Sequence, residues 1–97
     1  MLDLSALERP TLDIKLPDKT VVKLYPAKKK LIDRMIHVKE AEDTVSELYS
    51  ITAELLSNNT EGRAFTFDDV SEWDIGIVAA LFGAYTKFIA AVQKHPN

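Results

Sequence analysis

Residues 75–92 constrain the fold more than any other part of this 97-residue chain. Fourteen of these eighteen residues are alanine or a larger apolar residue, and only Thr86 and Lys87 are plainly polar. A helix that is apolar all round is normally buried in a large core or in a membrane, and a chain of this length can build only a limited core. We therefore expect a helix from about residue 74 to residue 94 that its own monomer covers only in part.

The larger side chains of this helix are the candidates for contact with another protein. They recur at helical spacing, so residues three or four apart share a face, and their ridges suit packing against a second helix. Because two sides of the helix are apolar, we expect the outward side to meet a second copy or a helical partner. The predicted partner-binding residues are Leu81, Phe82, Tyr85, Phe88, Ile89 and Val92.

A membrane span is the competing explanation for this helix. Lys87 lies inside the apolar run, the alanines make the run only mildly hydrophobic, and its length barely reaches that of a spanning helix. Gly76, Gly83 and the alanines would also let another helix approach closely in water. We predict protein cover and no membrane association, with a small membrane-active protein as the alternative.

The N-terminal part of the chain predicts an arm followed by a β-hairpin. Residues 1–10 show no sustained period, which indicates a flexible arm, and they lack the basic start and apolar run of a signal peptide. Apolar and polar side chains alternate over residues 11–16, and β-branched and aromatic side chains fill residues 20–25. The hairpin 11–25 is marginal alone, so it must lean on the helices or on a neighbouring copy.

Helical patterns follow Pro26. Leu31, Met35 and Val38 recur at spacings of four and three, which predicts one apolar stripe. Thr44 and Glu47 are spaced as a capping box that could start a second helix, although one bent helix over residues 27–57 stays open.

Two further capping signals predict the remaining helices. Thr66 and Asp69 form a second possible box, and Asp74 can cap the last helix. The predicted fold is mainly α, an N-terminal β-hairpin followed by three to four helices. Residues 11–97 form one domain, with its helical part at 27–94.

Charge is unevenly distributed along the chain, whose net charge is −3. Residues 1–39 carry a net charge of +4 and residues 40–97 a net charge of −7. This pattern fits two solvated faces of one domain, or a head-to-tail contact between the basic part of one copy and the acidic part of the next. The acidic total argues against nucleic-acid binding, which leaves a DNA-binding regulator only as an alternative.

Few residues could carry chemistry. Without cysteine the chain has no disulfide framework and no thiolate nucleophile, which fits a cytoplasmic protein. Neither His37 nor His95 has a serine nucleophile at a spacing that would indicate a catalytic pair. The carboxylates near residue 70 lack the alternating pattern of a calcium loop and suit helix capping better. We predict no enzymatic activity, no cofactor and no metal.

The order of these features resembles the small tail assembly chaperones of long-tailed bacteriophages and prophages of Gram-positive bacteria. The resemblance covers most of the chain and rests on the strand pair ending at residues 24–29, the helices to residues 55–63, the segment 65–70 and a last helix ending at 95–97. It implies a non-enzymatic protein of the bacterial host cytoplasm that coats the tape measure protein and recruits major tail protein. Together with the apolar helix it predicts a homo-oligomer, and no residue-level binding site follows from it.

Overall fold

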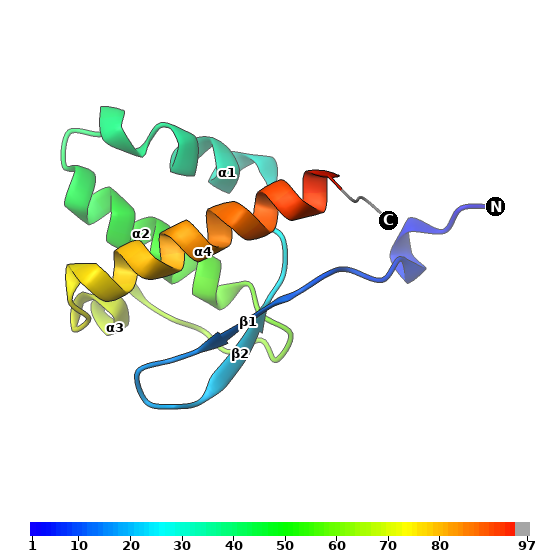
Figure 1. The fold of residues 1–97 in the computed structure, drawn as a ribbon, viewed down its shortest axis with the longest axis horizontal. Coiled ribbons are helices and arrows are strands. Elements are labelled where there is room, and N and C mark those ends of the chain that lie inside the picture. The colour runs from blue at the N-terminus through cyan, green and yellow to red at the C-terminus, as the bar shows by residue number, and fades with distance from the viewer. Residues whose placement is uncertain (95–97) are drawn as a thin grey trace.

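The computed structural model describes residues 1–94 and is mostly helical, with one β-hairpin (Figure 1). The predicted hairpin followed by three to four helices is confirmed. In chain order the elements are a 3₁₀ turn (Leu4–Ala6), strands β1 (Leu12–Lys15) and β2 (Val21–Leu24), helix α1 (Lys29–Ile36), a second 3₁₀ turn (Val38–Glu40), and helices α2 (Thr44–Ser57), α3 (Phe67–Ser71) and α4 (Ile75–Lys94).

The hairpin is closed by local turn chemistry. β1 and β2 pair antiparallel, with Ile14 opposite Val22, so alternate apolar side chains share one side of the sheet. Between the strands, the Asp18 carboxylate accepts hydrogen bonds from the backbone N–H of Thr20 at 2.9 Å and from its hydroxyl at 2.6 Å. Lys19 takes a positive φ of 72°, the left-handed conformation typical of three-residue hairpin loops.

The outer edge of β2 is covered by the loop after α2. The Tyr25 N–H donates to the Asn58 carbonyl at 2.9 Å, and the Thr60 N–H donates to the Lys23 carbonyl at 3.0 Å. The hairpin therefore leans on the helical part of its own chain. The buried Asn59 amide holds the loop together through bonds to the backbone of Leu56, Glu61 and Arg63.

Helices α1 and α2 are separate, so one continuous helix over residues 27–57 is ruled out. α1 begins at Lys29 rather than residue 27, because Lys28 is extended, with ψ of 161°. The N-cap of α2 is Asp43, whose carboxylate accepts from the Ser46 N–H at 3.0 Å. The expected cap, Thr44, is instead the first helical residue.

The caps predicted for the last two helices are confirmed. The Thr66 hydroxyl accepts from the Asp69 N–H at 3.1 Å, while the Asp69 carboxylate accepts from the Thr66 N–H at 2.9 Å, a complete capping box. The Asp74 carboxylate accepts from the Ile77 N–H at 3.0 Å and so satisfies one free amide in the first turn of α4.

Helix α2 is the centre of the fold, because it packs against α1, α3, α4 and β2. Figure 1 shows α4 crossing α2, with α1 on one side and the hairpin on the other. One hydrophobic core joins these elements. Its buried members are Leu16, Val22, Leu24, Met35, Ile51, Ala53, Leu55, Leu56, Val70, Leu81 and Tyr85.

Candidate functional site: the outer face of α4

The inner side of α4 belongs to the core. Val78 and Tyr85 are fully buried. The Tyr85 hydroxyl donates to the backbone carbonyl of Tyr25 at 2.6 Å, and its ring meets the Phe88 ring edge-on, with centroids 5.6 Å apart. Burial raises the pKa of Tyr85 to about 12, because the phenolate would lose its water. The hydrogen bond ties α4 to the segment that follows β2.

The predicted partner-binding residues occupy the inner side and the flanks of α4. Leu81 and Tyr85 are buried in the chain's own core, which corrects the expectation that they face outward. Burying large side chains releases more apolar surface from water than burying alanine, so α4 turns most of its large residues inward, while Ile75 and Ile77 in its first turn are exposed. The other four are half-buried, and their contact with a partner stays a prediction: Phe82, Phe88, Ile89 and Val92.

Small residues around one lysine make up the opposite side of α4. Lys87 lies one turn from Gly83 and one turn from Ala91, so it stands in the middle of this side. A Cβ added at Gly83 would meet nothing within 4 Å, which means that the surface there is open. We call this side the outer face, and its exposed members are Gly76, Ala79, Ala80, Gly83, Ala84, Lys87, Ala90 and Ala91.

The outer face is unusually apolar for an exposed surface. Residues 75–93 have a mean hydropathy of 1.9, and only 17% of the most apolar window is buried. By length and composition alone, this helix could cross a membrane. An ordinary surface helix carries a charged face, whereas exposed apolar patches mark sites of interaction with proteins, ligands or membranes. Its own chain therefore covers α4 only in part, as the sequence led us to expect.

Two grooves flank the outer face. The groove between α1 and α4, the α1–α4 groove, has a volume of about 310 Å³, and none of the described side chains that line it is charged. The groove between β1 and α4 has a volume of about 300 Å³, with Asp13 and Lys15 among its lining residues. Trp73 lines this second groove and packs against the core.

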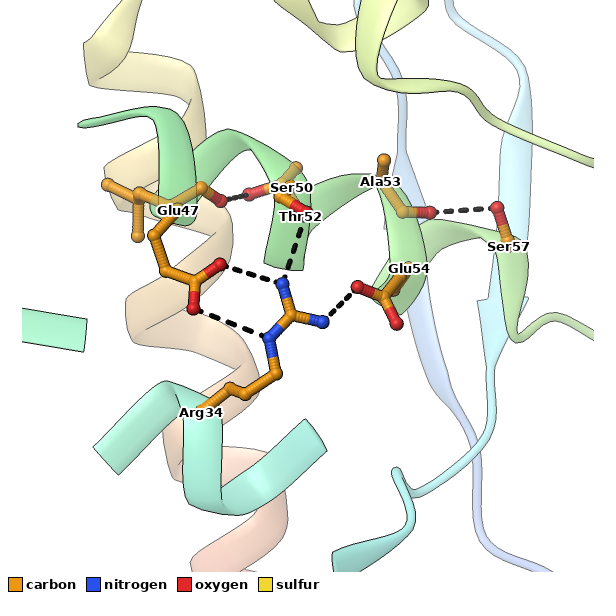
Figure 2. Close-up of polar contacts among 8 residues, drawn as sticks. Arg34, Glu47, Ser50, Thr52, Ala53, Glu54 and Ser57 are labelled. Atoms are coloured by element: carbon orange, nitrogen blue, oxygen red, sulfur yellow. Dashed lines mark hydrogen bonds and ion pairs between the residues drawn. The ribbon is translucent and has the colours of Figure 1, made fainter. Parts of the chain in front are cut away.

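A polar cluster joins α1 to α2 (Figure 2). Arg34 Nε and Nη2 donate to the Glu47 carboxylate at 3.4 and 2.7 Å, Nη2 also donates to the Ser50 hydroxyl at 3.1 Å, and Nη1 bonds Glu54. The hydrogen bond with Arg34 lowers the pKa of Glu47, and the two carboxylates raise that of Arg34. The cluster is thus a clamp between two helices.

The other residues considered for catalysis or metal binding make contacts within the fold. His37 is exposed, with Nδ1 2.9 Å from the Asp33 carbonyl oxygen, while Asp69 and Asp74 cap helices. Within residues 1–94 no three histidine or carboxylate side chains gather as a metal site would require. His95 lies outside the described residues.

Comparison of the chain with family models, curated proteins and solved structures finds no match. A functional argument therefore rests on the surfaces of the molecule. The outer face of α4 is exposed yet mostly apolar, which departs from the composition of an ordinary surface helix.

Proposed function

We propose that this chain is a non-enzymatic assembly chaperone that binds a partner helix through the outer face of α4. On this proposal the partner is the tape measure protein of a long-tailed phage, as the resemblance described above implies. On this proposal the chain also recruits major tail protein and self-associates, in the cytoplasm of the bacterial host. The observation that carries the proposal is a 20-residue helix whose exposed side is built mainly from alanine and glycine.

A helix is the partner that best suits this face. The distance between two packed helices depends on the side chains at their contact, and small side chains permit the closest approach. Helix-in-groove recognition also uses apolar residues at helical spacing, which the flanks of α4 supply. Lys87 can pair with a carboxylate of a partner in water, whereas a lysine at the centre of a bilayer costs about 2.5–3.5 kcal/mol. Protein cover is therefore favoured over lipid.

Gly83 is the position at which to test the proposal, because a side chain there points into open space on the monomer. Gly83→Ala and Gly83→Gln both improve helix propensity, by about 0.5–1 kcal/mol, so both variants should fold at least as well as the natural chain. Only glutamine is long enough to hold another helix away.

The assay is affinity capture of the tape measure protein from the phage or prophage that carries the gene. We expect Gly83→Ala to bind like the natural chain and Gly83→Gln to bind at least about tenfold more weakly. Equal capture by the two variants, or no capture by the natural chain, rejects the proposal.

A membrane-active protein is the second candidate, since the mean hydropathy of 1.9 over residues 75–93 favours it. Flotation with vesicles containing phosphatidylglycerol separates the two functions. A chaperone stays in the soluble fraction, and Lys87→Leu does not change this. A membrane-active chain floats with the vesicles, and Lys87→Leu strengthens its binding because the costly charge is gone.

A further inference from the structure

The first ten residues form an apolar arm that the described part of the chain leaves exposed. In Figure 1 the arm runs from the start of β1 away from the folded body, and each of its residues is exposed. The relative exposure is 73% for Leu2, 72% for Leu4 and 40% for Leu7. Flexible linkers are typically polar or rich in glycine and serine. The leucines of this arm instead indicate a segment that docks.

The arm is partly preorganised for docking. The Asp3 carboxylate accepts from the Ser5 N–H at 3.0 Å and from its hydroxyl at 2.6 Å, which caps a 3₁₀ turn. The Leu7 N–H donates to the Leu4 carbonyl at 3.4 Å and closes this turn, which holds the two leucines near each other. A segment that already holds its bound shape loses less entropy on binding.

The base of the arm is held on the body. The Arg9 guanidinium lies 3.9 Å from the centroid of the Tyr25 ring, close enough for a cation–π interaction. From this base the arm is directed outward (Figure 1), which favours contact with a neighbouring molecule over contact with its own body.

The α1–α4 groove offers the mostly apolar surface that the arm requires, and the two polar side chains that line it, Thr86 and Gln93, are uncharged. Ile36 on its rim is 68% exposed, more than any other large apolar residue outside the arm. By contrast, charged residues line both the groove beside β1 and the groove at the base of the arm. The apolar side chains lining the α1–α4 groove are Ile32, Met35, Ile36, Phe82, Ile89 and Ala90.

We propose that the arm of one copy docks in the α1–α4 groove of a second copy, with Leu4 and Leu7 against the rim formed by Ile36. Arm and groove are unlike surfaces, so the contact is heterologous and builds a chain or a ring unless two copies exchange arms. This inference deepens the self-association in the proposed function. The arm contact uses the α1 side of α4 and not Gly83, so the arm contact and the binding of a partner helix can fail separately.

A complementation experiment tests the proposal. A chain that begins at Glu8 lacks the apolar arm but keeps the groove, while Ile36→Glu alters the groove but keeps the arm. Light scattering and sedimentation should show association of the natural chain, and each variant alone should associate at least about tenfold more weakly. An equimolar mixture of the two variants should form a heterodimer, because it restores one arm and one groove.

A substitution of another exposed apolar residue serves as the matched control. Val45→Glu changes another exposed apolar residue, 56% exposed at the start of α2, and should leave association unchanged. Thermal melts by circular dichroism establish that each variant is folded. A natural chain that stays monomeric, a folded variant that still associates, or a mixture that stays monomeric overturns the inference. Gly83→Gln should leave association unchanged, so loss of helix capture alone counts only against the proposed function.

Discussion

Replacing Tyr85 with phenylalanine removes one hydroxyl from the junction between α4 and the hairpin. The ring of this fully buried residue keeps its edge contact with Phe88. The Tyr25 carbonyl loses its 2.6 Å donor and retains only the Asn58 amide at 3.5 Å, which is at the limit of a hydrogen bond. The substitution therefore isolates one buried hydrogen bond with almost no change in packing.

The expected loss of stability follows from that bond. An intramolecular hydrogen bond contributes a net 0.5–1.5 kcal/mol as a rule, and an unsatisfied buried acceptor costs about 1–3 kcal/mol. The Tyr25 carbonyl is partly buried and keeps one weak donor, so we expect a loss of about 1–2 kcal/mol. For a chain of this size, such a loss should lower the Tm by roughly 5–15 °C. Urea unfolding should show a lower midpoint with an unchanged slope, because the surface exposed on unfolding stays the same.

The pH dependence supplies a second readout for Tyr85→Phe. The pKa of Tyr85 rises from 10.0 to about 12 on folding, so the folded state holds this proton more tightly than the unfolded state. The stability that the folded state gains from this tighter proton binding is complete below pH 10 and is lost as the pH rises toward 12. The stability difference between the two proteins should therefore shrink over this range. A variant with the same Tm and the same alkaline slope as the natural chain would refute the reasoning.

Two polar side chains give further predictions. Asn59→Ala should lower the free energy of unfolding by about 1–3 kcal/mol, because it removes the buried amide that bonds the backbone of Leu56, Glu61 and Arg63. An unchanged urea midpoint would contradict this. Arg34→Met should cost about 0.5–1.5 kcal/mol near neutral pH, a modest value because the ion pairs are partly exposed. Since Arg34 lowers the pKa of Glu47, this contribution is present above the ordinary carboxyl range and is lost in acid, so urea titrations should show the difference narrowing as the pH falls.

Elements with local causes could be predicted from the sequence. The capping box of Thr66 and Asp69 and the Asp74 cap depend on residues within one turn, and the structure contains both. For α2 the sequence predicted Thr44 as the cap, although Asp43 beside it is an equally good capping residue. The structure selects Asp43, and the predicted boundary moves by one residue.

The orientation of α4 depends on contacts that the sequence does not display. A helix that is apolar all round has no broad charged face to mark its solvent side. Lys87 was nevertheless a usable signal. At about 100° per residue, Tyr85 lies almost opposite Lys87 on the helix, and this places Tyr85 inside. Residue size was the other signal, since from Val78 onward the large apolar side chains are buried or half-buried and the alanines are exposed, whereas Ile75 and Ile77 in the first turn are exposed.

The Arg34 clamp and the α1–α4 groove join residues far apart in the chain, so only the folded structure could reveal them. For the clamp, a weak signal existed, because Glu47, Ser50 and Glu54 recur at spacings of three and four on one face of α2. Nothing in the spacing of α1 indicated which helix would lie across from Ile36. The pairing of α1 with α4 follows from how both pack on α2.

Ala90 connects the two proposals made for α4, because it belongs to the outer face and also lines the α1–α4 groove. An arm docked in that groove would lie along the edge of the outer face and widen the apolar surface offered to a partner helix. If the docked arm and the partner helix contact each other favourably, each strengthens the binding of the other by the same factor. A partner helix would then favour self-association, and self-association would favour binding of the helix, which is the behaviour required to coat a long partner rather than bind it at isolated sites.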